Sequence, residues 1–236
     1  MRTDAAAANA PTPLSPRMRS ALIAGALVVV AITGVLIYAL ATGPRGLAPQ
    51  QQQDGALPAT RADSHVLDEA GPDAPTLVEF MDFECEACGA FYPAVEQIRE
   101  QYAGQINYVI RYFPIASHAN AMNAALAVEA AAQQGQVEDM YHRMFETQAE
   151  WGEQQTSRAD LFRSFAQDLG LDLAAYDDAI ADPATQERVQ QDLDDGQALG
   201  VQGTPTFFLD GERLELSSVQ DLTAALDRAL DASGSA

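Results

Sequence analysis

Between residues 79 and 91 the chain reads Glu79-Phe-Met-Asp-Phe-Glu-Cys85-Glu-Ala-Cys88-Gly-Ala-Phe91. This stretch holds the two cysteines of the sequence, at C-x-x-C spacing. A disulfide between residues so close together closes a loop too small to stabilise a domain much by chain entropy. The pair therefore indicates chemistry at sulfur.

The residues on either side predict a strand followed by a helix. The apolar run 75–83 has the length of a buried strand, and Gly71-Pro72 and Pro75 bound it on its N-terminal side. After the cysteines, apolar residues recur at helical spacing up to Gly104. Cys85 would then lie at a helix N-terminus, where backbone N–H groups and the helix dipole stabilise a thiolate. We expect Cys85 to be the attacking sulfur and Cys88 the resolving one.

Glu79 is a carboxylate in the middle of the predicted strand. If the strand is central, burial raises the pKa of Glu79. A carboxyl six residues before Cys85 can lie under the start of the helix and take a proton from Cys88. The alternative is a solvated glutamate on a sheet edge.

Two other interpretations of the cysteines carry no redox chemistry. One is half of a zinc site, but there is no second C-x-x-C, and the histidines are scattered at positions 65, 118 and 142. The other is an inert structural pair. We interpret His118 as a residue near a helix start, without a chemical role.

The rest of the folded region predicts an α/β domain with a helical insertion. A second strand at 106–113 follows the first helix, and strand, helix and strand in this order imply parallel pairing. Helical patterns then follow one another from about 117 to 200. A strand at 205–209, a tight turn at 210–211, a partner strand at 212–216 and a last helix complete the pattern.

The N-terminal sixty residues predict a membrane anchor. Residues 1–19 resemble a disordered tail, and 20–42 form an uncharged apolar segment long enough to span a membrane as a helix. Arginines at positions 2, 17 and 19 favour a cytoplasmic N-terminus. Residues 43–63 have the composition of a flexible linker, and the folded domain is expected over 64–236. A cleaved signal peptide is the alternative, and it also exports the domain.

The chain is strongly acidic, with a formal net charge of -21, and its basic residues are all arginines. Nucleic acids and anionic lipid surfaces would be repelled by such a surface. We therefore exclude nucleic acid as a partner and interpret the charge as a solubilising surface.

Two separated segments, Val78-Glu-Phe-Met-Asp-Phe-Glu-Cys-Glu-Ala-Cys88 and Gly200-Val-Gln-Gly-Thr-Pro-Thr-Phe-Phe208, resemble the signature segments of the bacterial DsbA-like thiol:disulfide oxidoreductases. The resemblance covers roughly residues 64–232. It implies a thioredoxin fold, in which a mixed central sheet is flanked by helices and carries an all-helical insertion.

The resemblance also implies roles for particular residues. Cys85 matches the exposed nucleophile, Cys88 the resolving thiol of a Cys85–Cys88 disulfide, and Glu79 the buried acid beneath them. Thr204-Pro205 matches a loop whose proline is cis and faces the disulfide, where a substrate peptide pairs with the backbone. The redox group would be the disulfide itself, without a cofactor or metal.

This family likeness implies an extracytoplasmic enzyme that introduces disulfides into exported proteins and is recycled by a membrane or soluble redox partner. Two alternatives stay open: a thiol reductase or disulfide isomerase at the same site, and a non-catalytic binding or scaffold domain. The chain departs from the best-known oxidants by having Glu86-Ala87 between the cysteines instead of Pro-His. Because carboxylates such as Asp82, Glu84 and Glu86 oppose thiolate formation, we expect a weaker oxidant.

Overall fold

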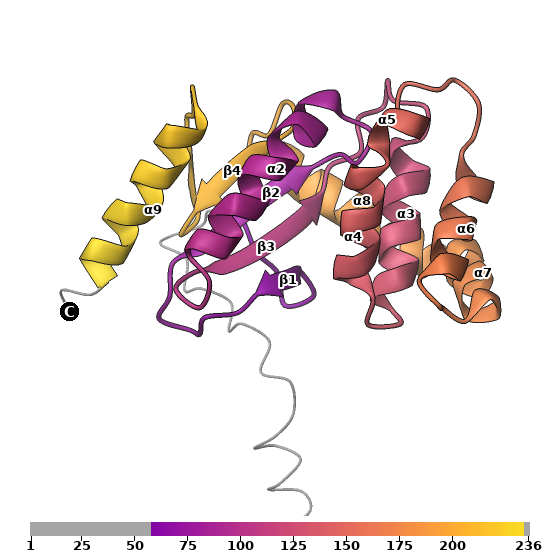
Figure 1. Ribbon diagram of the computed structural model, residues 1–236, viewed down its shortest axis with the longest axis horizontal. Coiled ribbons are helices and arrows are strands. Elements are labelled where there is room, and N and C mark those ends of the chain that lie inside the picture. The colour runs from indigo at the N-terminus through magenta and orange to yellow at the C-terminus, as the bar shows by residue number, and fades with distance from the viewer. Residues whose placement is uncertain (1–57, 234–236) are drawn as a thin grey trace, which may run out of the picture. The chain divides into compact units, whose positions relative to one another are not determined.

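The computed structural model describes residues 58–233 of the chain (Figure 1). The predicted tail 1–19, the predicted membrane-spanning segment 20–42 and the first part of the predicted linker lie outside these residues. Within 58–233, no helix combines the length and apolar character needed to cross a membrane.

The strands of the described region form one mixed sheet in the order β1-β3-β2-β4-β5. Its two central strands, β2 (Thr76–Met81) and β3 (Asn107–Tyr112), pair in parallel, as the strand-helix-strand order predicted. The other pairings are antiparallel, with β1 (His65–Asp68) beside β3 and β4 (Thr206–Leu209) beside β2. The outer strand β5 (Glu212–Arg213) is shorter than the predicted 212–216. The mixed α/β sheet of a thioredoxin fold is therefore confirmed.

The helices follow the predicted order. Helix α2 (Glu86–Gln101) begins at the cysteines and leads from β2 to β3. The helical insertion between β3 and β4 consists of α3 (Ala121–Ala132), α4 (Val137–Glu146), α5 (Gln148–Trp151), α6 (Ala159–Asp168), α7 (Leu173–Ala181) and α8 (Pro183–Ala198). The last helix of the described region, α9 (Val219–Ser233), packs beside the sheet (Figure 1).

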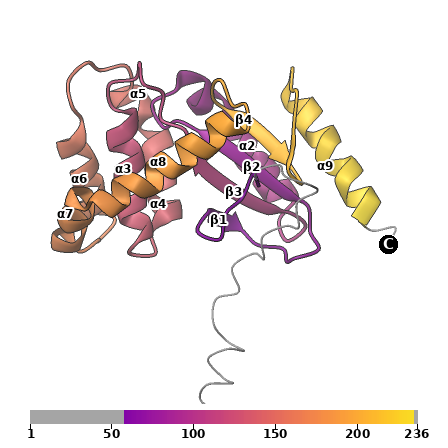
Figure 2. The same cartoon turned by 180° about the vertical axis from the view of Figure 1, so that it is seen from behind.

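Successive side chains of each strand point to opposite faces of the sheet, and a hydrophobic core covers each face. Leu77 and Met81 of β2 belong to the larger core, which contains residues of α2, α4 and α9, whereas Val78 and Phe80 belong to a smaller core on the opposite face. Figure 2 shows α8 crossing this second face. Glu79 shares the alternation of Leu77 and Met81, so its side chain lies on the face covered by α2.

A buried ion cluster joins α8 to the sheet. The guanidinium of Arg111 on β3 is fully buried and lies 2.6 Å from Asp192 and 2.7 Å from Asp195, both on α8. It also donates to the carbonyl oxygen of Ala59, which is itself buried. The contacts of the domain therefore begin at Ala59, inside the predicted linker 43–63 and before the predicted start of the domain at Ser64. A buried guanidinium without hydrogen-bond acceptors would be costly, and the Ala59 carbonyl oxygen is one of its acceptors.

Candidate active site

Cys85 occupies the N-cap position of α2, between the end of β2 and the first helical turn. Its backbone is extended, and its carbonyl oxygen accepts the first helical bond, from the N–H of Gly89 at 3.0 Å. Both cysteines are free thiols. Cys85 is 8% exposed, less than the family pattern implies for a nucleophile, and Cys88, one turn further along, is 1% exposed. Only Cys85 can therefore meet a substrate sulfur first.

The surroundings of Cys85 stabilise its thiolate. The pKa of Cys85 is lowered to about 5. The largest cause is a hydrogen bond with the Cys88 side chain, and burial acts in the opposite direction. Thr204 and the backbone N–H groups of Cys88 and Ala87 lower the pKa further. The Cys85 thiol also lies 3.4 Å from the carbonyl oxygen of Thr204. The N–H groups at the start of α2 thus contribute to the lowering, although none makes a hydrogen bond that caps the helix with the Cys85 sulfur.

The loop before β4 faces the two cysteines. The Thr204–Pro205 peptide bond is cis, as the family resemblance implied. Thr204 lowers the pKa of Cys85 and partly opposes the rise in the pKa of Cys88, and its buried hydroxyl has no hydrogen-bond partner among the described residues. The structure therefore brings Thr204 and Pro205 to the cysteines across more than a hundred residues of sequence, because β4 pairs with β2.

Glu79 is 2% exposed, so the alternative of a solvated edge glutamate is wrong. Its Oε2 lies 2.5 Å from the Tyr108 hydroxyl. Burial raises the pKa of Glu79 to about 8, although the Tyr108 hydrogen bond opposes the rise. The pKa of Cys88 is also raised, mainly by burial and further by Cys85 and by the charge of Glu79. A Glu79 that is protonated at neutral pH can therefore give its proton to a Cys88 thiolate.

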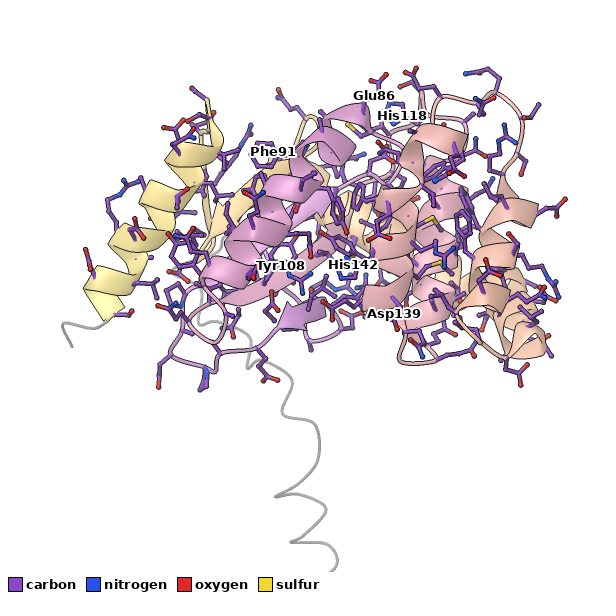
Figure 3. All side chains as sticks on the ribbon, in the orientation of Figure 1. Glu86, Phe91, Tyr108, His118, Asp139 and His142 are labelled. Carbon is purple, nitrogen blue, oxygen red and sulfur yellow. The ribbon has the colours of Figure 1, made fainter. Side chains whose placement is uncertain are left out.

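His118, which we had assigned no chemical role, lies at this site. Its Nδ1 is 2.7 Å from the Oδ2 of Asp82, a carboxylate that is 1% exposed. Burial alone would lower the pKa of His118, but the hydrogen bond and charge of Asp82 and the charge of Cys85 raise it. Figure 3 shows His118 and Glu86 at the end of the domain where α2 begins.

The acidic residues around Cys85 are arranged differently from our expectation. Asp82 accepts hydrogen bonds from the backbone N–H groups of Ile115 and Glu84, and the Oε2 of Glu84 accepts one from the N–H of Asn120. Both side chains are buried, whereas Glu86 is exposed. The largest contributions to the pKa of Cys85 come from Cys88, burial and Thr204. That the carboxylates oppose thiolate formation stays a prediction.

Gln148 on α5 makes hydrogen bonds to the backbone around Cys85, between the end of β2 and the start of α2. Its Nε2 donates to the carbonyl oxygens of Phe83 and Cys85, at 2.7 and 2.9 Å. This approach requires Gly89, because a Cβ at that position would lie 1.9 Å from the Oε1 of Gln148. The glycine that follows the C-x-x-C was the one sequence signal of this contact.

These features define a domain of the thioredoxin class, with a helical insertion and a two-thiol site at a helix N-terminus. A family model described as Thioredoxin matches residues 71–228, about two thirds of the chain, and the chain belongs to this family.

Solved structures show the same fold. DsbA1 of the alpha type from Wolbachia pipientis is 20% identical, with a TM-score of 0.64 over 74% of this chain and 94% of that one. A thioredoxin-like oxidoreductase from Silicibacter pomeroyi is 25% identical, with a TM-score of 0.59 over 71% of this chain and 92% of that one. The chain is thus a member of the thioredoxin superfamily, and its fold is that of these structures.

The curated relatives carry a different name. A Na(+)/H(+) antiporter NhaA 1 of Mycolicibacterium gilvum is 36% identical over 148 residues, which are 60% of this chain and 23% of that protein. The chain therefore spans about a quarter of the length of such relatives.

Proposed function

We propose that this chain is an extracytoplasmic thiol:disulfide oxidoreductase that introduces disulfides into exported proteins. One observation carries the proposal: Cys85 lies at the N-cap of α2 beside the Thr204–Pro205 loop, with Cys88 buried one turn behind it. A helix N-terminus stabilises the Cys85 thiolate, and stabilisation of the reduced form makes a dithiol protein an oxidant.

The reaction exchanges one disulfide for another. A substrate thiolate attacks the Sγ of Cys85 in the Cys85–Cys88 disulfide, and Cys88 leaves as a thiolate that takes the proton of Glu79. A second substrate thiolate then attacks the substrate sulfur of the mixed disulfide, and Cys85 leaves as a thiolate. The substrate dithiol loses two electrons and the enzyme disulfide gains them. No other cofactor or metal is needed, but a separate disulfide or quinone-linked partner has to take the electrons away.

In this proposal the Thr204–Pro205 loop receives the substrate backbone next to the reacting sulfurs. Its support is the contact between Cys85 and the Thr204 carbonyl oxygen, since this contact places the loop at the point of attack. The substrates are peptides or proteins with free thiols that have crossed the membrane.

The location is proposed from the sequence. The uncharged segment 20–42 would anchor the domain in the cell membrane with its N-terminus in the cytoplasm, and the linker would present it outside. The relationship to a domain-sized part of proteins named Na(+)/H(+) antiporters supports a setting at the membrane. Secretion after cleavage of the segment is the alternative. Fractionation of cells and protease treatment of spheroplasts distinguish the two.

Alkylation of the thiols in living cells tests the direction of the reaction. A mostly oxidised Cys85–Cys88 pair is expected, and a mostly reduced pair would favour a reductase or an isomerase. Titration of the purified domain against glutathione then gives the potential. A Cys85→Ser variant is expected to be inactive, and full function in that variant would favour a scaffold domain.

The strength of the oxidant stays a hypothesis. A Cys85 pKa of about 5 agrees with a thiolate that is stabilised, but less so than in the strongest oxidants of this type. A measured pKa below about 4 would contradict a weaker oxidant.

A further inference from the structure

Gln148 of the helical insertion reaches across to the turn 82–85, which connects β2 to α2 and ends at Cys85. Its side-chain amide donates to two carbonyl oxygens, that of Phe83 at 2.7 Å and that of Cys85 at 2.9 Å. Helix α5, which carries Gln148, lies beside the start of α2 in both views (Figure 1 and Figure 2). The insertion is therefore joined directly to the reactive cysteine, although 63 positions separate the two residues in sequence.

The neighbours of the Gln148 amide determine its orientation. A flipped amide would place the Oε1 atom against the two carbonyl oxygens, where one acceptor would meet two others, so the NH₂ group has to face them. The Oε1 atom then lies at Gly89, in the space that a Cβ would occupy. The side chain therefore fits in one orientation between the turn 82–85 and the start of α2.

The rest of α5 is fixed in the core, so Gln148 approaches the turn 82–85 from a rigid base. Trp151, three residues further along, is 0% exposed. Its Nε1 donates to the carbonyl oxygen of Met144 at 3.3 Å, and its ring lies 4.8 Å from the ring of Phe162. The carbonyl oxygen of Gln148 accepts a hydrogen bond from the N–H of Gly152 at 2.7 Å. A side chain on such a base can position a turn that it contacts.

The two carbonyl oxygens lie on either side of Glu84, so Gln148 fixes the backbone that leads into Cys85. Cys85 is the N-cap of α2, and its backbone is extended, with φ -68° and ψ 121°. This conformation directs the side chain of an N-cap residue toward the N–H groups of the second and third helical residues, here Ala87 and Cys88. The Cys88 side chain is the largest cause of the lowered pKa of Cys85, and these two N–H groups add to it.

The carbonyl oxygen of Phe83 depends on Gln148. Phe83 is 1% exposed, and within residues 58–233 no other donor bonds to its carbonyl oxygen. The Cys85 carbonyl oxygen has a second donor, the N–H of Gly89 at 3.0 Å. A buried acceptor without a partner is costly. Without Gln148, the turn 82–85 would therefore have to move until the Phe83 oxygen met another donor or water, and Cys85 would move with it.

We propose that Gln148 is a positioning residue for the exchange at Cys85, because its two hydrogen bonds hold the Cys85 sulfur at the N-terminus of α2, where a thiolate is stabilised. The inference rests on the proposed thiol–disulfide exchange and assigns part of its control to the helical insertion. A thiolate is charged and a disulfide is not, so this positioning stabilises the reduced form and leaves the oxidised form nearly unchanged. Gln148 thereby makes the domain a stronger oxidant.

The test compares the full-length wild type with Gln148→Met, which keeps the length and bulk of the side chain but has no N–H group. In the reduced proteins, the ultraviolet absorbance of the thiolate as a function of pH gives the pKa of Cys85. We expect Gln148→Met to increase this pKa by roughly 0.5–1 pKa unit. The equilibrium with glutathione at pH 7 should accordingly shift toward the protein disulfide by roughly three- to tenfold. Gln148→Glu also lacks the N–H groups and adds negative charge, so its effect should be at least as large.

Gln134→Met is the matched control. Gln134 is half-buried like Gln148, and its amide also makes two hydrogen bonds to the backbone, to the N–H and the carbonyl oxygen of Asp172 at 2.9 and 3.1 Å, beyond the C-terminal end of α3. This variant should keep the wild-type pKa of Cys85 and the wild-type equilibrium with glutathione.

A purely structural role of Gln148 would lower the stability to urea and leave the pKa of Cys85 unchanged. An unchanged pKa in Gln148→Met and in Gln148→Glu would therefore overturn the inference, and it would leave the proposed function intact because this measurement needs no substrate. If Gln148→Met folds poorly, Gln148→Glu gives the answer with the same readout. A wild-type protein that does not exchange thiols with glutathione at all would overturn the proposed function, and the positioning role with it.

Discussion

The Nδ1 of His118 lies 2.7 Å from the Oδ2 of Asp82, and this pair lies within electrostatic reach of the Cys85 thiol. The Asp82 carboxyl is fully buried and the His118 ring is 28% exposed. The aspartate thus holds an imidazole at the rim of the site, whereas Glu86-Ala87 between the cysteines provide no basic group.

Replacement of His118 by alanine should raise the pKa of Cys85. The pKa of His118 is raised, so the imidazolium persists above its ordinary pH range and stabilises the neighbouring thiolate. We expect an increase of roughly 0.5–1 pKa unit, as for one charge in a partly exposed site. The ultraviolet absorbance of the thiolate as a function of pH measures it. His142→Ala removes an imidazole elsewhere and should leave the pKa of Cys85 unchanged; an equal pKa in His118→Ala and wild type would refute this role.

Glu79→Gln should stabilise the domain at alkaline pH. The folded-state pKa of Glu79 is about 8, above its ordinary value of 4.5. Between these values the unfolded chain has lost a proton that the folded chain keeps, so stability falls as pH rises. Glutamine removes this dependence and still accepts a hydrogen bond from Tyr108. In urea unfolding of the oxidised proteins, the variant should gain about 3–5 kcal/mol over wild type between pH 4.5 and pH 8. If the unfolding free energies of wild type and Glu79→Gln changed equally with pH, Glu79 would not titrate in this way.

Much of the fold and part of the site could be predicted because the signals are local. The C-x-x-C, the apolar strand before it and the helical spacing after it lie within about thirty residues, and they define Cys85, Cys88 and Glu79 together. The start of α8 is likewise encoded locally, because the Asp182 side chain accepts a hydrogen bond from the N–H of Ala184 and Pro183 follows it in the first turn.

The partners of these residues could not be predicted, since they come from distant elements with no pattern of their own. Tyr108 fits the apolar periodicity of β3 and was indistinguishable from an ordinary core residue. Gln148 has no periodic signal at all. The direction of the Asp82 and Glu84 side chains depends on the loop that enters α3, and composition alone therefore exaggerated the negative charge near Cys85.

The stability of the reduced domain relative to the oxidised one should increase with pH. The pKa of Cys85 is about 5 when folded and has an ordinary value of 9.0, so the folded state loses its proton first. The reduced form should gain about 1.4 kcal/mol per pH unit between these values, and the gain is lost as pH falls through 5. The oxidised form lacks this titration, because its Cys85 sulfur carries no proton. Urea unfolding of both forms at several pH values measures the difference, and a difference independent of pH would contradict an acidic Cys85.

The contact between Gly89 and Gln148 predicts that replacing this helical glycine by alanine destabilises the domain, whereas such a replacement usually stabilises a helix. Alanine in place of glycine inside a helix normally stabilises it by about 0.5–1 kcal/mol. At position 89, however, the new Cβ would lie 1.9 Å from the Gln148 Oε1, so Gln148 must swing away. Its hydrogen bonds to the carbonyl oxygens of Phe83 and Cys85 are then lost, each worth roughly 0.5–1.5 kcal/mol.

Gly89→Ala alone should therefore destabilise the domain, by about 1 kcal/mol, and should slow thiol exchange because the Cys85 turn loses its support. In a Gln148→Ala background the obstacle is absent, and the same Gly89→Ala change should stabilise by about 0.5–1 kcal/mol. Urea unfolding of the wild type, the two single variants and the double variant gives both values in one cycle. If Gly89→Ala had the same effect in both backgrounds, Gln148 would not be the reason for glycine at this position.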